Sequence, residues 1–172
     1  MDINKKEVEV KRKNIKSFVT HPKYGNEPLV TNYKLSQEER EYLNLYFEKD
    51  SYFPNTVIVA DLNKQNCLYG LRLYVDVKVK CRDCHRSFIF FAQQQQYWFE
   101  TLKFWIDSCC IRCYDCRQKR REIKEWQKLY NRLVLKENKS KDELKALKKV
   151  ALELLQIGVI RAIKKINSIE EV

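Results

Sequence analysis

The sequence is poor in histidine, glycine and proline and has no long hydrophobic run. With 2 histidines, 3 glycines and 3 prolines among 172 residues, we expect neither a histidine-based catalytic site nor a many-turned sandwich or barrel. No stretch approaches the roughly 18 consecutive apolar residues that cross a bilayer, and the charged N-terminus lacks the apolar segment of a secretory signal. These absences predict a small, non-enzymatic cytoplasmic protein that does not enter a membrane.

Acidic residues are also outnumbered, and unevenly so along the chain. Lys and Arg total 34 against 23 Asp and Glu, a net charge of +11. Residues 117–172 carry 16 basic and 8 acidic residues, whereas the other 116 residues carry 18 and 15. Such a basic C-terminal third is typical of a chain whose partner is rich in phosphate. A solvated helix face would have the same composition.

Cysteine, by contrast, is plentiful, and four of the 7 cysteines form two spaced pairs. Cys81 and Cys84 make one CxxC, and Cys113 and Cys116 make another after a gap of 28 residues. Two such pairs supply the four tetrahedral sulfur ligands that zinc prefers, whereas a redox CxxC needs no second pair. In a reducing compartment cysteines bind metal more often than they form disulfides. The pattern predicts one structural zinc ion in a closed four-sulfur site.

One ligand of this site is ambiguous, because Cys110 and Cys113 also form a CxxC. Cys110 could therefore replace Cys116. We prefer Cys116, which leads directly into a helix whose dipole stabilises a thiolate. Cys67, Cys109 and Cys110 are then core or incidental thiols.

Local patterns predict short strands and helices before the second cysteine pair. Ser36, followed by acidic residues, begins a helix that Pro54 prevents from extending far beyond residue 51. The alternation over residues 71–80 indicates a strand with one buried face, with Asp76 among the residues on the opposite face. Three further elements are expected: a strand at 88–91, a helix at 93–102 and a strand at 104–106.

From Arg117 onward the pattern becomes helical and predicts a helical hairpin. Ser140 and Glu143 form a capping box that opens a second helix, expected to run to about Ile166 with Gly158 weakening its middle. This helix carries an apolar stripe that either packs on the chain itself or binds a partner helix or a second copy. The stripe comprises Leu144, Leu147, Ala151, Leu154, Ile160 and Ile163.

An aromatic strand and a Gln–aromatic segment lie between the cysteine pairs. The run is Cys81-Arg82-Asp83-Cys84, Phe88-Ile89-Phe90, Gln96-Tyr97-Trp98-Phe99, Phe104 and Cys113-Tyr114-Asp115-Cys116-Arg117. In this combination, residues 78–120 resemble a family of bacterial zinc-ribbon domains of the treble-clef type, which has no defined activity. The resemblance implies zinc ligation by Cys81, Cys84, Cys113 and Cys116.

Two positions depart from the family pattern. His85 and Lys103 stand where the family has glycines, the first in a turn that needs a positive φ and the second at the end of the short helix. Upstream, residues 21–25 (HPKYG) are expected to form an ordered turn. This segment is similar to one in larger bacterial proteins that carry the domain.

We therefore expect an α+β chain with three regions. They are an N-terminal extension at 1–70 with a basic arm, the HPKYG loop and a short helix, a treble-clef zinc-ribbon domain at 71–120, and a basic helical hairpin at 117–168. The expected function is binding of nucleic acid, RNA or ribosome rather than specific DNA. The candidate residues are Arg117, Lys119, Arg120, Arg121, Lys124 and Lys128.

Two further expectations remain open at this stage. Four aromatic residues either stack on bases or fill the core of the domain, namely Tyr97, Trp98, Phe99 and Trp105. The alternative function is a protein–protein interaction module, in which the helical hairpin binds a partner protein or forms a homodimer.

Overall fold

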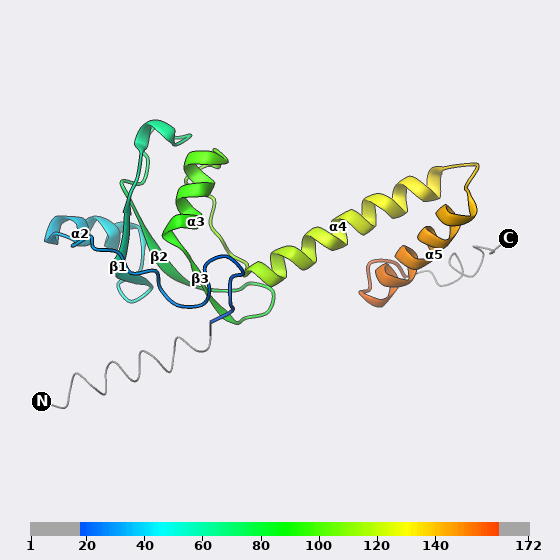
Figure 1. Ribbon diagram of the computed structural model, residues 1–172, viewed down its shortest axis with the longest axis horizontal. Coiled ribbons are helices and arrows are strands. Elements are labelled where there is room, and N and C mark those ends of the chain that lie inside the picture. The colour runs from blue at the N-terminus through cyan, green and yellow to red at the C-terminus, as the bar shows by residue number, and fades with distance from the viewer. Residues whose placement is uncertain (1–17, 162–172) are drawn as a thin grey trace, which may run out of the picture. The chain divides into compact units, whose positions relative to one another are not determined.

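A computed structural model describes residues 18–161 (Figure 1). The expected basic arm and the end of the predicted hairpin, 162–168, lie outside the described residues. The chain divides into two compact units, residues 1–116 and 117–172. Within the described part, no helix is both long enough and apolar enough to span a bilayer.

The first unit is built on a three-stranded antiparallel sheet in the order β1-β2-β3. β1 spans Tyr52–Val59, β2 spans Leu73–Lys80 and β3 spans Ser87–Phe90. β1 is an edge strand whose register shifts between Phe53 and Ile58, which is where a sheet tolerates Pro54. The segment expected to be an N-terminal extension thus supplies one strand of this sheet.

β2 is buried on both faces over residues 73–77, so the prediction of a single buried face is wrong there, although Lys78 and Lys80 are exposed as expected. On one side Leu73 and Val75 pack with Leu43 of α2 (Gln37–Tyr46). On the other side Tyr74 packs with Phe99, beneath α3 (Ala92–Gln96) and the π-helical turn η2 (Tyr97–Thr101). Figure 1 shows α2 and α3 on opposite sides of the sheet. The helix predicted at 93–102 is confirmed as α3 followed by η2.

Asp76, which was assigned to the exposed face, is fully buried and joins three segments. Its Oδ1 accepts a hydrogen bond from the Ala92 N–H and its Oδ2 accepts one from the Leu29 N–H, both at 2.7 Å. The Asp76 N–H donates to Thr56 Oγ1 at 2.8 Å. Because α3 has no side-chain cap of its own, the carboxylate caps it from the neighbouring sheet. Burial raises the pKa of Asp76 to about 6, although the two N–H donors act in the opposite direction.

The segment after η2 is irregular, so the strand predicted at 104–106 is wrong. Lys103 ends the helical segment with a φ of 57°, the left-handed conformation for which the family uses glycine. Trp105 and Ser108 then close a turn through an N–H to carbonyl bond of 2.9 Å. A 3₁₀ turn, η1 (Leu62–Lys64), lies in the long loop between β1 and β2. The chain therefore reaches the second cysteine pair through turns rather than a strand.

Two helices, α4 (Tyr114–Leu135) and α5 (Lys141–Gln156), supply the described part of the second unit. The predicted capping box is confirmed, since the Ser140 Oγ accepts from the Glu143 N–H at 3.3 Å and the Glu143 carboxylate accepts from the Ser140 N–H at 2.9 Å. Of the predicted apolar stripe of α5, Leu147, Ala151 and Leu154 are buried and Leu144 is half-buried; the neighbouring Val150 is also buried.

α5 ends ten residues before the predicted limit of Ile166. Gly158 has a φ of 73°, and its N–H donates to the Leu155 carbonyl while the Val159 N–H donates to the Leu154 carbonyl, each at 2.9 Å. These two bonds form a Schellman motif, which terminates a helix. Gly158 is thus a stop signal rather than a weak point within the helix. Ile160 follows the helix, and Ile163 lies beyond the part that the structure describes.

Candidate metal centre

The four predicted cysteines come together at one point in the first unit. The Sγ atoms of Cys81, Cys84, Cys113 and Cys116 all lie within 4.8 Å of one another. Those of Cys84 and Cys113 are 3.8 Å apart. This separation is far from the about 2.0 Å of a disulfide, and it equals the about 3.8 Å edge of a tetrahedron whose Zn–S bonds are 2.3 Å long. The donor set therefore fits one tetrahedral zinc ion.

The first pair lies in the loop at the tip of the β2–β3 hairpin. β2 ends at Lys80, opposite Ser87 of β3, and the loop is closed by the Cys81 N–H donating to the Arg86 carbonyl at 2.9 Å. The His85 N–H donates to the Cys81 carbonyl at the same distance. His85 has a φ of 59°, which confirms the positive φ expected where the family has glycine.

The second pair lies at the start of α4. The helix begins at Tyr114, so Cys116 belongs to its first turn and Cys113 immediately precedes it. The Cys113 N–H donates to the Cys81 Sγ at 3.4 Å. A hairpin loop followed by a helix that supplies the last ligand is the arrangement that the sequence predicted. The metal would thus join the sheet to the first turn of α4.

Two ion pairs and one backbone bond cross from one cysteine pair to the other. Arg112 Nε donates to both carboxylate oxygens of Asp83 at 3.0 Å, and Arg86 pairs with Asp115 at 3.1 Å. The Arg82 N–H donates to the Ile111 carbonyl at 2.9 Å. Both halves of the site are thereby aligned by contacts other than the metal bonds.

The electrostatics of the cluster favour a bound cation. Burial raises the pKa of the Cys81 thiol, but backbone N–H donors that include Cys113 outweigh it and lower this pKa to about 6. Backbone hydrogen bonding also lowers the pKa of Cys84, whereas burial raises the pKa values of Cys113 and Cys116. Four thiolates this close would repel one another, which disfavours their ionisation. A bound divalent cation offsets this repulsion and stabilises the four negative charges.

An apolar and aromatic shell surrounds the cluster. Phe88 and Phe90 of β3 pack on it with Val19 and Trp98. Near the start of α4, His21 lies 5.1 Å from the Tyr114 ring and stacks on Tyr24 at 4.8 Å. The bridge between His21 and Gly25, where φ is 80°, confirms the predicted turn. The HPKYG segment therefore packs against the residue between the two ligands of the second pair.

Cys110, the rival ligand, is buried beside the cluster but is not one of its four members. Its thiol donates to the Arg112 carbonyl at 3.5 Å. Cys67 is half-buried and Cys109 is exposed, and neither belongs to the group of four.

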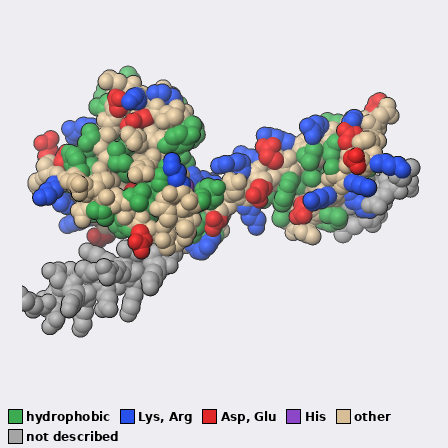
Figure 2. Space-filling view, in the orientation of Figure 1, with side chains coloured by type: hydrophobic (Ala, Val, Ile, Leu, Met, Phe, Trp, Pro, Cys, Tyr) green, Lys and Arg blue, Asp and Glu red, His purple; other side chains and the backbone are tan. Residues whose placement is uncertain are grey.

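The predicted nucleic-acid residues all lie on α4, and five of them share a face. At about 100° per residue, these five fall within an arc of about 100°, which we call the basic stripe: Arg117, Arg120, Arg121, Lys124 and Lys128. Arg117 is half-buried and the other four are exposed. Lys128 is paired with Glu125 at 2.7 Å. Figure 2 shows Lys and Arg side chains along this helix with acidic ones interspersed.

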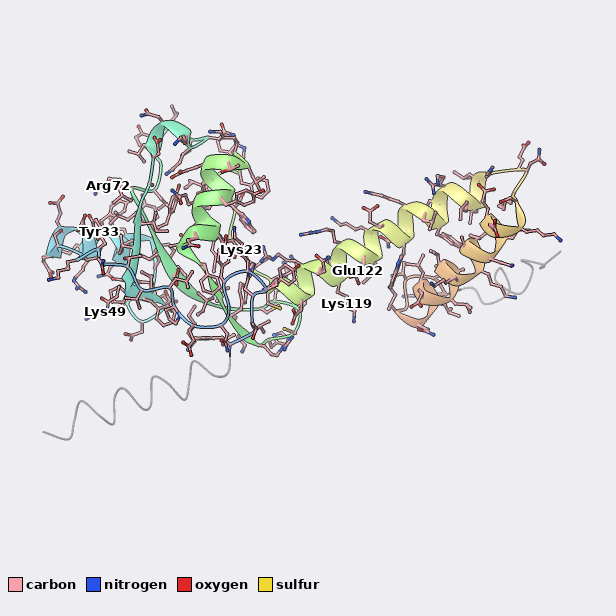
Figure 3. The ribbon with its side chains drawn as sticks, in the orientation of Figure 1. Lys23, Tyr33, Lys49, Arg72, Lys119 and Glu122 are labelled. Atoms are coloured by element: carbon pink, nitrogen blue, oxygen red, sulfur yellow. The ribbon has the colours of Figure 1, made fainter. Side chains whose placement is uncertain are left out.

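Lys119 does not share that face, and one residue that the sequence analysis missed extends it. Lys119 falls about 150° from the middle of the basic stripe, on the same side as Glu122 (both labelled in Figure 3). Arg132 is exposed and continues the stripe for one more turn. The sequence already indicated this position, because Arg132 follows Lys128 by four residues, about one helical turn. The opposite face of α4 carries Trp126, Tyr130 and Leu133.

The aromatic residues considered for base stacking have different environments. Phe99 is buried in the core and Trp98 packs between Phe90 and Phe104. Tyr97 and Trp105 are exposed. Phe99 and Trp98 thus pack within the domain, as the core expectation held, whereas Tyr97 and Trp105 remain accessible for stacking.

Comparison with known proteins bears on the metal centre. A family model described as "Probable treble clef domain" matches residues 75–125, which contain both cysteine pairs and the first part of α4. Searches of curated proteins and of solved structures found no significant match. The chain contains a treble-clef domain with one structural zinc site, which confirms the predicted fold and metal.

Proposed function

We propose that this zinc protein is not an enzyme and that it binds nucleic acid through the basic stripe of α4. The observation that supports the proposal is the gathering of five cations on one helix face directly after the last zinc ligand, Cys116. Arginine and lysine spaced at three and four residues along a helix can pair with successive phosphates. Four sulfur ligands leave zinc no open position for an activated water, so its role is structural.

The composition of the stripe favours structured RNA over a specific DNA sequence. Phosphate contacts position a protein but carry no sequence information. Arginine can read guanine, but reading a mixed sequence also needs amide or carboxylate side chains aimed into a groove. The stripe consists of cations, and two amides, Asn131 and Gln127, lie on or beside the same face between Arg117 and Leu135. Recognition by backbone shape suits folded RNA.

The alternative, a protein-interaction module, loses its main support. It depended on an apolar stripe along α5 that is open to a partner. Leu147, Val150, Ala151 and Leu154 are each at most 7% exposed within this one chain. A partner would have to displace packing that already exists, so we favour nucleic acid.

The test removes the four exposed cations of the stripe together, as Arg120→Gln, Arg121→Gln, Lys124→Gln and Lys128→Gln. Wild-type affinity for an RNA hairpin, measured by fluorescence anisotropy, should fall by about 500-fold between 50 and 200 mM salt if about five phosphates are contacted. The variant should lose most of its affinity at 50 mM salt and keep only a shallow salt dependence. Zinc content measured in parallel should remain one ion per chain.

A matched control removes four cations from α5 instead: Lys141→Gln, Lys145→Gln, Lys148→Gln and Lys149→Gln. It changes net charge by the same amount and should retain most of the affinity. If both variants lose affinity equally, binding follows overall charge and the stripe is not a site. Absence of binding by the wild-type protein at 50 mM salt would end the nucleic-acid proposal.

A further inference from the structure

Three large apolar or aromatic side chains are strongly exposed near the end of η2. Leu68 is 96% exposed, Tyr69 is 89% exposed and Trp105 is 65% exposed. Single exposed apolar residues are ordinary on protein surfaces, but a group of them marks a binding site. These three line one open cavity of about 500 Å³, within the about 300–1,000 Å³ of small-molecule sites, which we call the Trp105 pocket. Its lining residues are Asn66, Cys67, Leu68, Tyr69, Trp105, Ile106 and Asp107.

The backbone on the Trp105 side of the pocket is held in place. The ring of Phe104 lies edge-on to Trp98 with centroids 5.5 Å apart, and the Phe104 N–H donates to the Trp98 carbonyl at 3.0 Å. Ile106 packs against the core around Tyr74 and Phe99. Trp105, between these two anchored neighbours, is the residue left facing solvent. Its position therefore follows from the anchoring of its two neighbours.

The opposite wall of the pocket is tied to the same segment. Lys103 Nζ donates to the Lys64 carbonyl at 2.6 Å, and Asn66 Nδ2 donates to the Lys103 carbonyl at 3.3 Å. Gln65, between them, donates its Nε2 to the Leu71 carbonyl at 2.7 Å and to the Tyr74 hydroxyl at 2.9 Å. Asn66 is thus held beside the Trp105 segment, and fixing these two parts of the lining lowers the entropic cost of binding a ligand there.

We propose that the Trp105 pocket binds an unpaired nucleobase. Two aromatic rings in the lining offer faces for stacking. The lining also contains an amide, Asn66, and a carboxylate, Asp107. An amide carries one acceptor and two donors, and the bond to Lys103 uses one donor. Pockets that bind single bases combine ring stacking with hydrogen bonds to the base edge in this way.

The polar groups favour a base over an apolar protein side chain. A docked apolar side chain would cover Asn66 and Asp107 without offering either of them a hydrogen-bond partner, which is costly. A base edge offers N–H donors to Asp107 and stacks its ring on Trp105. The choice of nucleic acid as the ligand class rests on the proposed function, but this pocket lies in the first unit and is tested separately from the basic stripe.

The experiment compares a single-stranded RNA 10-mer with a blunt RNA duplex of the same sequence, using the full zinc-loaded chain. Trp105→Ala should weaken single-strand binding by about tenfold, since stacking of one base contributes on the order of 5- to 150-fold in affinity. Duplex binding should change by less than about twofold, because paired bases cannot enter the pocket. Trp105→Tyr should restore single-strand binding, and Tyr46→Ala, an exposed aromatic on α2, should have no effect.

Fluorescence gives an independent readout. In a protein with Trp98→Phe and Trp126→Phe, Trp105 is the remaining tryptophan, and its emission should be quenched by the single strand and not by the duplex. If Trp105→Ala leaves both affinities unchanged, or lowers both equally, the pocket is not a base site, and a protein partner becomes its better occupant. Loss of binding only in the stripe variant would support the basic stripe as the binding site and overturn the Trp105 pocket. Loss of binding only in Trp105→Ala would support the Trp105 pocket and overturn the basic stripe.

Discussion

Cys110 and Cys116 lie at equal distances in sequence on either side of Cys113, yet their thiols have different surroundings. The Cys116 Sγ belongs to the group of four within 4.8 Å, in the first turn of α4. The Cys110 thiol donates to the Arg112 carbonyl and fills part of the shell around the cluster. The helix thus selects between two cysteines that the spacing alone leaves equivalent.

This difference predicts opposite results for two single substitutions. Cys116→Ser should lose stoichiometric zinc, because a hydroxyl is a poor replacement for a thiolate ligand. Cys110→Ser should keep one zinc per chain, with a modest loss of stability from the altered shell. Native mass spectrometry with and without a chelator measures both. A Cys116→Ser protein with full zinc beside a Cys110→Ser protein without it would show that the ligand assignment is wrong.

Asp76 predicts a pH dependence that runs against the usual one for a carboxylate. Its folded-state pKa of about 6 lies above its ordinary value of 3.8, so the folded protein binds more protons than the unfolded chain between these values. Its contribution to stability is therefore largest at low pH and is lost as pH rises towards 6. The difference in unfolding free energy between wild type and Asp76→Asn should fall by about 1.4 kcal/mol from pH 5.0 to 7.5.

Urea unfolding of zinc-saturated protein at the two pH values measures this difference. Glu39→Gln is the control, because the hydrogen bond from Tyr33 lowers the pKa of Glu39 and places its titration below the range examined. Its difference from wild type should stay nearly constant. A difference for Asp76→Asn that rises with pH would mean that the two N–H bonds to its carboxylate outweigh burial.

At the scale of elements, local signals were sufficient to predict those helices whose ends are set by neighbouring residues. The capping box predicted for Ser140 and Glu143 is present, and Ser36, predicted as a helix start, also forms a capping box with Glu39. The strand leading into Cys81 and the four clustered cysteines were likewise predictable, because alternation and ligand spacing are local patterns. For these elements, the local sequence pattern was enough to predict the observed structure.

Elements that depend on distant partners could not be predicted in the same way. The second buried face of β2 exists because α3 and η2 cover Tyr74 and Asp76, and no pattern within the strand announces this. The segment 104–106 is a short aromatic and β-branched run of the kind found in strands, but Phe104 and Ile106 anchor a turn instead. The Trp105 pocket could not be predicted, because four of its seven lining residues come from a loop without periodicity.

At the scale of the whole molecule, the zinc ligands and the buried residues of α5 belong to different units. All four ligands lie within residues 1–116, while the buried residues of α5 lie in the second unit. Structural zinc contributes an apparent binding free energy of about 10–16 kcal/mol, comparable with the entire stability of about 5–15 kcal/mol of an ordinary domain. The first unit should therefore depend on zinc far more than the second.

Zinc removal is expected to unfold the chain in part. After chelation, amide hydrogens over Cys81–Cys116 should lose their protection from exchange, because the hairpin loop, the β2–β3 pairing and the first turn of α4 share the metal as their common anchor. Amides over Lys141–Gln156 should keep theirs, since α5 is capped by Ser140, terminated by Gly158 and buried along Leu147–Leu154 without any zinc ligand. Hydrogen exchange followed by mass spectrometry resolves the two regions, and Cys116→Ser in zinc-containing buffer should reproduce the chelated pattern. Equal loss of protection in both regions would mean that the two units fold as one, and that zinc supports α5 as strongly as the treble clef.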